Sequence, residues 1–401
     1  MITLEEINQI SVVSPSKIVM LVIDGLGGLP DPKTGKTELE TAHTSNFDSL
    51  AENGACGLID PVSPGVTPGS GPGHLALFGY DPLRFTIGRG VLEALGIGFE
   101  LKETDVAARG NFCTVDDDGV ITDRRAGRIT TDKCAELCEM LSQIKLEGVE
   151  LFALPVKEHR FLFVMRGEEL AAEVNDTDPQ RIGVAPNMAL ATESQAKNTA
   201  HIVNEFVDEV QEILARHQPA NMILLRGFSK LPDIPSMGEI YKLKPAAIAC
   251  YPMYKGLARL VGMKVFNAEN GIEEELKILA DCYSEHDFFY IHVKESDSAG
   301  EDGDFSRKVK VIERVDYALP QLLKLTPEVI VVTGDHSTPA LLKGHSWHPV
   351  PILLYSQWCR RDKAREFSES ACASGGLGRL RGTDIMLVAM ANALKLTKFG
   401  A

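Results

Sequence analysis

The sequence lacks the marks of several protein classes. It has no C-x-x-C pair, no internal repeat, no low-complexity tract and no apolar run of bilayer-spanning length. Positive charge is in deficit, because the net charge is −15 at pH 7, and this argues against a general binder of nucleic acids or anionic membranes. The first residues, MITLEEINQISVV, carry acids where a secretory signal would be basic, so we expect a cytoplasmic protein.

The cysteines exclude a disulfide scaffold. Eight of them are scattered along the chain, at positions 56, 113, 134, 138, 250, 282, 359 and 372. We expect them to be reduced and mostly buried. Cys134 and Cys138 are four residues apart and could bind a soft metal ion, but thiols without neighbouring partners are usually just buried. We assign them no role.

The residues that are present are typical of a globular protein, with 44% hydrophobic and 24% charged side chains. Short apolar segments of strand length alternate with helical patterns. The expected strands cover residues 17–23, 222–225, 246–249, 263–266, 288–293, 329–332 and 350–354, and the expected helices cover residues 197–217, 253–261 and 305–325. The alternation predicts an α/β fold with a mostly parallel sheet that is flanked by helices.

A different pattern between residues 101 and 195 predicts an inserted domain. The turn signals Asp117-Asp118-Gly119 and Arg166-Gly167 flank segments of alternating polarity such as residues 159–165. We therefore expect a core made of residues 1–100 and 196–401, and an α+β cap domain at residues 101–195.

Two motifs near the N-terminus suggest a reactive site. Asp24 ends the first expected strand and precedes Gly25, and ligands of α/β proteins bind at the carboxyl ends of strands. The same dipeptide also fits an ordinary turn. Ser70 precedes an expected helix, where free backbone N–H groups favour a phosphate, so it is the candidate nucleophile. Its alternative role is a helix N-cap.

Three further groups follow later strands. Asp335 and His336 come directly after residues 329–332 and combine a hard oxygen with an imidazole, which suits Zn²⁺ or Mn²⁺. His345 lies in the next loop, where its closeness in sequence favours the same site over a solvated histidine. Asp297 is the first candidate in the acidic segment after residues 288–293, in which most acids are expected to face water.

These groups all fall at strand ends or at a helix start, so one site can gather them. Their carboxylates and imidazoles exceed the needs of one catalytic ion. We therefore expect a two-metal site in which one ion activates the serine.

The motifs together resemble a known family. They are Asp24-Gly25, Pro68-Gly69-Ser70, His74-Leu75-Ala76-Leu77, Gly79-Tyr80-Asp81-Pro82, Gly88-Arg89-Gly90, Asp123-Arg124-Arg125-Ala126-Gly127-Arg128, Gly334-Asp335-His336-Ser337, and His345 before Pro349-Val350-Pro351. Over nearly the whole chain the set is similar to the cofactor-independent, or 2,3-bisphosphoglycerate-independent, phosphoglycerate mutases of the archaeal type. This resemblance implies an alkaline-phosphatase-like core, within the alkaline phosphatase superfamily, that carries a cap.

The resemblance also implies a ligand set. One ion would be held by Asp24, Ser70, Asp335 and His336, and the other by Asp297, His345 and a third residue. The family generally places a histidine four residues after the aspartate that matches Asp297, whereas this chain has Glu301 there. An oxygen ligand would favour Mn²⁺ or Mg²⁺ over Zn²⁺. We expect two divalent ions, Mn²⁺ first, and no bisphosphoglycerate.

Arginine is concentrated at the expected cap of this acidic chain. Its planar fork matches carboxylate and phosphate, both of which a phosphoglycerate carries. The alternative is a solvated basic loop, in which the acids only orient the arginines. The expected substrate-binding residues are Asp123, Arg124, Arg125, Arg128, Arg160, Asp178 and Arg226.

We therefore expect interconversion of 3-phosphoglycerate and 2-phosphoglycerate through a phosphoserine at Ser70, with the glycerate held under the cap. A phosphomonoester or phosphonate hydrolase on the same scaffold is the first alternative. A noncatalytic metal-binding protein is the second, and Glu301 is its only support. Nucleic-acid and membrane partners are not expected, and the sequence leaves the oligomeric state open.

Overall fold

The chain folds into two compact units. The computed structural model describes residues 2–269 and 271–400, and its contacts divide the chain into Met1–Thr86 with Ile234–Ala401, here the core unit, and Ile87–Asp233, here the inserted unit. Each unit has a sheet of its own. No described helix is both long and apolar enough to cross a membrane.

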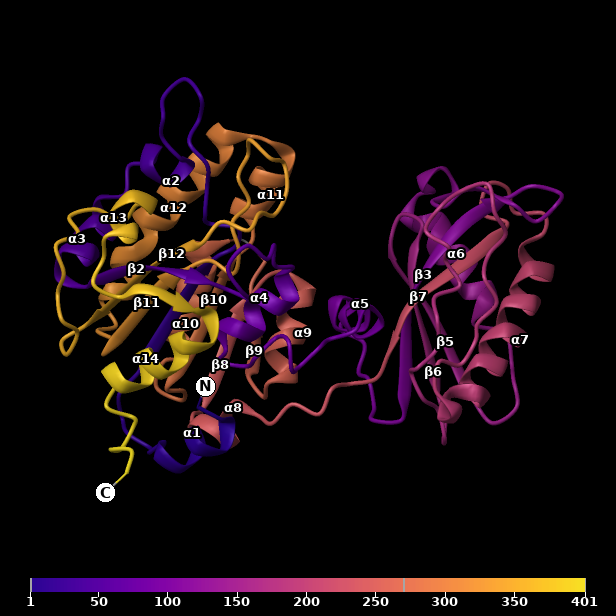
Figure 1. Ribbon diagram of the computed structural model, residues 1–401, viewed down its shortest axis with the longest axis horizontal. Helices are drawn as coiled ribbons and strands as arrows, with labels where there is room; N and C mark the ends of the chain where they lie inside the picture. The colour runs from indigo at the N-terminus through magenta and orange to yellow at the C-terminus, as the bar shows by residue number, and fades with distance from the viewer. Residues whose placement is uncertain (1, 270, 401) are drawn as a thin grey trace. The chain divides into compact units, whose positions relative to one another are not determined.

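Within the described residues, eight strands form the sheet of the core unit, in the order β13-β2-β12-β11-β1-β10-β8-β9 (Figure 1). Their bounds are β1 Ile18–Ile23, β2 Ala55–Asp60, β8 Pro245–Ala249, β9 Lys264–Asn267, β10 Phe288–Val293, β11 Val329–Thr333, β12 Val350–Ser356 and β13 Gly378–Arg381. All neighbouring pairs are parallel except those of β12, which runs antiparallel to β11 and to β2. The expected mostly parallel sheet is confirmed.

The central strands explain the apolar segments of the sequence. Every residue of β1, β10 and β11 is buried, as expected of parallel strands that are covered on both faces. In the register of the sheet, Ile23 lies beside Val293 and Val22 beside Thr333. The chain therefore leaves three adjacent strands at the same edge of the sheet.

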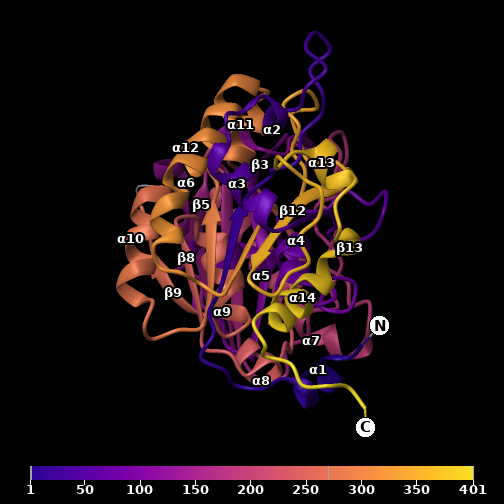
Figure 2. The ribbon, with the colours of Figure 1, turned by 90° about the vertical axis from the view of Figure 1, so that its left-hand side faces the viewer.

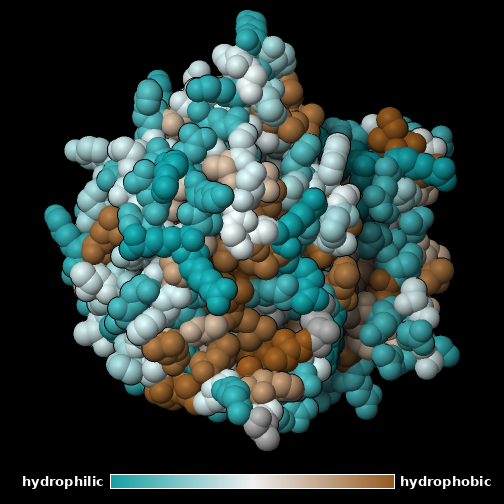
Figure 3. Space-filling view, turned by 60° about the vertical axis from the view of Figure 1, so that its left-hand side comes forward, coloured by the Kyte–Doolittle hydropathy of each residue, from teal (hydrophilic) through white to brown (hydrophobic). Residues whose placement is uncertain are grey.

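Helices cover both faces of the core sheet, and Figure 2 shows α10 and α12 on one side and α14 on the other. The helices of the core unit are α1 Leu4–Ile10, α2 Glu38–Thr41, α3 Ser45–Asn53, α4 Ser70–Leu77, α8 Met237–Tyr241, α9 Pro252–Leu260, α10 Ile272–Cys282, α11 Glu295–Asp302, α12 Phe305–Leu323, α13 Glu369–Ala373 and α14 Ile385–Asn392. Hydrophilic side chains cover most of the face in Figure 3, and hydrophobic ones gather toward its lower edge.

The direction of β12 corrects one expectation. Residues 350–354 do form a strand, but it is antiparallel, because the chain turns back directly after β11 instead of crossing over the sheet. The connecting loop, residues 334–349, consequently begins and ends at the carboxyl edge of β11.

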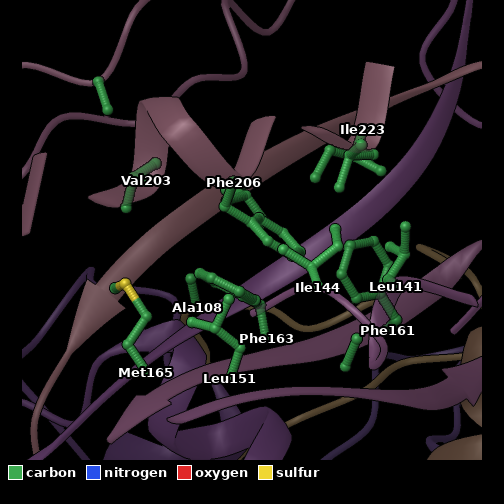
Figure 4. Close-up of a cluster of buried hydrophobic side chains, with 14 of the residues drawn as sticks. Ala108, Leu141, Ile144, Leu151, Phe161, Phe163, Met165, Val203, Phe206 and Ile223 are labelled. Atoms are coloured by element: carbon green, nitrogen blue, oxygen red, sulfur yellow. The ribbon is translucent and has the colours of Figure 1, made fainter. Parts of the chain in front are cut away.

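The inserted unit contains an antiparallel sheet of five strands in the part of the chain described. Its elements are α5 Arg89–Ile97, β3 Asp105–Val115, β4 Ile121–Asp123, a 3₁₀ turn at Ala126–Arg128, α6 Thr131–Leu141, β5 Glu150–Lys157, β6 Arg160–Arg166, a 3₁₀ turn at Ser194–Ala196, α7 Lys197–Leu214 and β7 Met222–Ser229. Phe163 of β6 stacks on Phe206 of α7 with ring centroids 4.3 Å apart, and Figure 4 shows this contact in the buried cluster that joins sheet and helices.

The inserted unit is wider than the expected cap. The sequence predicted residues 101–195, whereas the compact unit also includes α5 before them and α7 and β7 after them. Residues 222–225 form a strand as expected, but β7 pairs antiparallel with β3 and does not join the parallel sheet. The apolar composition of a segment predicts that it forms a strand, but it does not predict which strand it pairs with.

The turn signals were partly correct. Asp117-Asp118-Gly119 does form the β3–β4 turn, with Gly119 at φ 75° and its N–H donating to Asp116 O at 3.0 Å. Arg166-Gly167 is not a hairpin, because the chain continues into a long segment with one bridge between Val174 and Ala191. The β5–β6 hairpin instead turns at Glu158, which has a left-handed φ of 52°.

The cysteines are placed as expected. All eight lie in the described ranges as free thiols, and six of them are buried. Cys134 and Cys138 lie in α6 with their Sγ atoms 4.0 Å apart, inside the hydrophobic cluster of the inserted unit.

Candidate active site

Four of the predicted metal ligands meet at the carboxyl edge of the core sheet. Asp24 follows β1, Asp297 lies in α11 directly after β10, and Asp335 and His336 follow β11. Because β10, β1 and β11 are neighbours in the sheet, their carboxyl ends bring these side chains together. All four are buried to 1% exposure or less. The structure thus brings these four predicted residues together.

The first cluster surrounds the Nε2 atom of His336. Asp335 Oδ2 lies 3.2 Å from it, and Asp24 Oδ1 and Ser70 Oγ each lie 3.3 Å from it. Neither of these carboxylate oxygens accepts a hydrogen bond from the described residues, although both are buried. A buried carboxylate oxygen without a hydrogen-bond donor is costly unless a cation compensates it. Two oxygens, an imidazole and a hydroxyl therefore fit a divalent metal ion.

Ser70 is not used as a helix cap. Helix α4 starts at Ser70, its N-cap residue is Gly69, and no side chain caps it. The Ser70 hydroxyl faces His336 instead, at the helix end where free N–H groups attract anions. Gly73 allows this approach, because a Cβ atom there would lie 2.4 Å from the carbonyl oxygen of Asp335.

A second cluster joins Asp297, His336 and His345. His345 donates through Nδ1 to Pro68 O at 2.9 Å, which leaves Nε2 as a free ligand atom 3.6 Å from Asp297 Oδ1. The rings of His345 and His336 stack with centroids 3.6 Å apart. Thr338 Oγ1 donates to Asp297 Oδ1 at 2.7 Å and lies 2.9 Å from His336 Nδ1. That contact leaves His336 Nε2 for the first cluster.

Glu301 lies beside the second cluster but is more open. Its Oε1 is 3.9 Å from His345 Nε2, and its side chain is 55% exposed. Its role as a ligand stays a prediction. The neighbouring acid Asp302 is paired with Arg307 at 2.6 Å, and His348 contacts Ser346 Oγ at 3.1 Å.

Sequence reasoning missed a set of side chains behind the ligands. Lys294 Nζ lies 3.1 Å from Asp24 Oδ2, 2.5 Å from Asp297 Oδ2 and 3.2 Å from Tyr254 Oη. His292 Nε2 lies 3.1 Å from Asp24 Oδ2. In this segment only acids were predicted to be ligands. Lys294 and His292 also stand at the end of a buried strand, and this position is the signal that could have identified them.

His74 belongs to the same buried set. Its Nδ1 atom is 2.8 Å from Ser70 O and 3.1 Å from Asp335 Oδ2. The ring is fully buried, so its contacts hold both Ser70 and Asp335 in place. Such contacts orient metal ligands.

The cluster keeps its carboxylates charged. Burial raises the pKa of Asp24, but the hydrogen bond from His292 and the charges of His336 and Lys294 outweigh it and hold that pKa well below its ordinary value. Burial and Asp24 raise the pKa of Asp335, yet the neighbouring histidines keep it lowered. Burial lowers the pKa of His336, which favours the neutral imidazole that a metal ion needs. Burial also opposes the charge of Lys294, but Asp24 and Asp297 raise its pKa above the ordinary value.

The inserted unit contains a separate basic cavity. Its volume is about 500 Å³, and it is lined by Arg89, Arg109, Asn111, Arg124, Arg125, Arg128, Lys157, Glu158, His159, Arg160 and Arg226. It gathers all five predicted arginines. Arg89, Arg109, Lys157 and His159 were not predicted, although Arg89 stands in one of the motifs. Arg109, Lys157 and His159 reach the cavity through the strand pairing of β3, β5 and β6, which the sequence does not reveal, whereas Arg89 is the first residue of α5.

The two predicted acids hold the arginine segment in place. Asp178 forms two hydrogen bonds with Arg124, at 2.6 and 3.0 Å, and lies 3.6 Å from Arg226. Asp123 accepts from the backbone N–H groups of Arg125 at 2.8 Å and Gly127 at 2.6 Å. Both contacts are those of orienting residues.

The backbone of this segment is strained. Ala126, Gly127 and Arg128 have left-handed φ values of 46°, 62° and 54°, and such values are uncommon outside glycine. In the described ranges, no acid lies within ion-pair distance of Arg125, Arg128 or Arg160. These three guanidinium groups are therefore available to an anion.

The comparisons with known proteins agree with this geometry. A family model described as 2,3-bisphosphoglycerate-independent phosphoglycerate mutase matches residues 51–221. A Thermus thermophilus protein, named a probable 2,3-bisphosphoglycerate-independent phosphoglycerate mutase, is 51% identical over 393 residues, which are 97% of this chain and 97% of that protein. The solved cofactor-independent phosphoglycerate mutase of Thermoplasma acidophilum is 32% identical with a TM-score of 0.75 and covers 94% of this chain and 100% of its own. The PH0037 protein of Pyrococcus horikoshii is 31% identical with a TM-score of 0.81 and covers 97% of this chain and 100% of its own.

Proposed function

Because the chain belongs to the 2,3-bisphosphoglycerate-independent phosphoglycerate mutases, we propose that it interconverts 3-phosphoglycerate and 2-phosphoglycerate through a phosphoserine at Ser70. One observation carries the proposal: the Ser70 hydroxyl lies 3.3 Å from His336 Nε2, beside two buried carboxylate oxygens without hydrogen-bond partners. A nucleophile placed among metal ligands is the arrangement that phosphoryl transfer needs.

Two divalent ions complete the proposed site. Asp24, Asp335, His336 and Ser70 would hold one ion, and Asp297, His345 and Glu301 the other. When bound, such ions neutralise charge on the nucleophile and on the phosphoryl oxygens. The ligand set is rich in oxygen, which supports Mn²⁺ or Mg²⁺ over Zn²⁺.

The reaction is a transfer out and back. Ser70 Oγ attacks the phosphorus atom, the bond to the C3 oxygen breaks, and the proton of the serine hydroxyl ends on the released glycerate. The C2 hydroxyl of the same glycerate then attacks the phosphoserine, and its proton returns to Ser70. His74 holds the carbonyl of Ser70 at 2.8 Å during both transfers.

The arginine cavity is the proposed binding site for the glycerate. Arg125, Arg128 and Arg160 lack acidic partners in the described residues, so their donors can contact the carboxylate of the substrate. Arg124 and Arg226 are held by Asp178 and orient the cavity. The proposal requires that the glycerate is retained between the two transfers. The reaction would serve glycolysis and gluconeogenesis in the cytoplasm.

A metal-dependent hydrolase is the competing function, and retention of glycerate separates the two. Purified protein would be assayed with 3-phosphoglycerate and Mn²⁺, Mg²⁺ or Zn²⁺, without bisphosphoglycerate, while 2-phosphoglycerate and inorganic phosphate are both followed. Formation of 2-phosphoglycerate well above release of phosphate supports the mutase. Release of phosphate as the main product would establish the hydrolase, and absence of both products would leave only the noncatalytic alternative.

A further inference from the structure

Lys294 connects the two ligand clusters. It lies directly after β10 and is 19% exposed, with its ammonium group between Asp24 of the first cluster and Asp297 of the second. Both contacts use the Oδ2 atom of the aspartate, at 3.1 and 2.5 Å. The third donor direction of the ammonium group points to Tyr254 Oη at 3.2 Å.

The other oxygen of each aspartate faces the histidines. Asp24 Oδ1 is buried, accepts no hydrogen bond from the described residues and lies 3.3 Å from His336 Nε2. Asp297 Oδ1 lies 3.6 Å from His345 Nε2 and 4.0 Å from His336 Nδ1. Each carboxylate is therefore divided into one oxygen that binds the lysine and one that faces a ligand cluster.

We propose that Lys294 is a positioning residue that ties Asp24 to Asp297 through their Oδ2 atoms, so that each aspartate offers only Oδ1 to a metal ion. The inference rests on the proposed two-metal site. A carboxylate whose second oxygen is occupied binds a cation through one oxygen, which fixes the direction of the metal–oxygen bond and limits the number of ligand atoms.

The charge of Lys294 acts in the same place. Asp24, Asp297 and Asp335 bring three negative charges into a buried space, and the ammonium group neutralises one of them. With metal ions bound, the positive charge of Lys294 would strengthen the attraction of the site for an incoming phosphoryl group. The same charge would repel each metal ion and weaken its binding. Lys294 thus lowers metal affinity and favours transfer.

This role predicts that the Lys294→Met variant binds metal ions more tightly than the wild-type protein. Loss of the lysine removes one contact from Asp297 Oδ2 and one from Asp24 Oδ2, which keeps its contact with His292, and it also removes a positive charge. Both changes strengthen metal binding. A residue that only supports the fold would do the opposite. Lys308 supplies that control, because it is fully buried in the same unit and donates to the backbone oxygens of Gly27 at 3.0 Å and Thr338 at 2.9 Å without contacting a ligand carboxylate.

The experiment compares wild type, Lys294→Met and Lys308→Met after chelation, by calorimetric titration with Mn²⁺ and by the visible spectrum with Co²⁺. For Lys294→Met we expect Mn²⁺ to bind at least about tenfold tighter, the Co²⁺ bands to weaken as the coordination number rises, and mutase turnover to fall. For Lys308→Met we expect weaker Mn²⁺ binding. Lys294→Gln, which keeps a hydrogen-bond donor but no charge, replaces the methionine variant if that variant does not fold.

The outcomes separate this inference from the proposed function. Unchanged or weaker Mn²⁺ binding in Lys294→Met, with wild type binding two ions, would overturn the role of Lys294 and leave the mutase site intact. Failure of the wild-type protein to bind two ions would instead overturn the two-metal site on which the inference rests.

Discussion

The ligands at the carboxyl edge of the core sheet are almost fully buried, whereas the arginines of the inserted unit line an open cavity of about 500 Å³. The buried ligands stand at the ends of parallel strands, whose register fixes them. Three of the arginines, Arg124, Arg125 and Arg128, belong to a segment with a strained turn that two aspartates hold in place. The contrast matches the division of labour in the proposed function, which assigns the phosphoryl chemistry to the core unit and recognition of the substrate to the inserted unit.

The largest effect is expected for Ser70→Ala. Both mutase activity and phosphate release should fall by at least about 10³-fold, because the covalent acceptor is lost. Steady-state rates and mass spectrometry of trapped phosphoserine measure this, and circular dichroism checks that the fold is intact. Turnover close to that of wild type would remove Ser70 from the mechanism and end the proposed division of labour.

Removal of metal with a chelator tests the same contrast without a mutation. Activity should disappear and return with Mn²⁺. Hydrogen exchange should increase in residues 24–28 and 335–346, which lose the cation that holds their carboxylates together, while residues 123–128 should not change. An equal change in the arginine segment would show that the two sites are not independent.

Arg125→Ala and Arg128→Ala probe the inserted unit alone. We expect the mutase kcat/KM to fall about 10- to 100-fold, because a charge-assisted contact with the glycerate is lost, while hydrolysis of an aryl phosphate changes little. Arg181→Ala is the matched control, since Arg181 is an exposed arginine of the same unit outside the cavity. Equal losses in both assays would show that these arginines belong to a solvated loop and do not recognise the glycerate.

A smaller effect is expected at Glu301, the proposed third ligand of the second ion. Glu301→Gln should raise the Mn²⁺ concentration for half-maximal activity about tenfold, because one charged ligand becomes neutral. Asp302→Asn is the neighbouring control, as Asp302 is paired with Arg307. An identical metal titration for Glu301→Gln and wild type would show that Glu301 is a surface acid and not a ligand.

The smallest effect concerns a carboxylate of the core that has no role in the site. Burial raises the pKa of Glu275 from 4.5 to about 9. Between these values only the folded state keeps the proton, so stability falls as the pH rises through this interval. Glu275→Gln should therefore raise Tm by a few degrees at pH 8 and much less at pH 5. Thermal denaturation at both pH values measures this, and an equal shift at both would contradict the raised pKa.

The sequence predicted which acids lie together at the edge of the core sheet more completely than which residues line the arginine cavity, and strand order explains why. Residues 288–293 form β10 with the predicted bounds, and Asp24, Asp297 and Asp335 follow buried strands whose apolar composition already implies a parallel sheet. A ligand at the end of such a strand is placed by the fold class alone.

The inserted unit could not be delimited in this way. β7 has the same apolar composition as a core strand, and only its pairing with β3 assigns it to the other sheet. Arg109 and Lys157 reach the cavity through such pairings as well. Lys294 was missed for a different reason, because its role depends on which oxygen of each aspartate it contacts.

The β11–β12 loop is a suitable place for an engineered insertion. The backbone N–H of Ser346 donates to Ser337 O at 2.9 Å. This hydrogen bond closes the base of the loop, whose exposed tip contains Leu341 and Leu342. Insertions are best tolerated at exposed tips whose ends are held. A short peptide that carries a fluorophore, placed after Leu342, would report on metal binding at the proposed site from outside while His336 and His345 keep their positions.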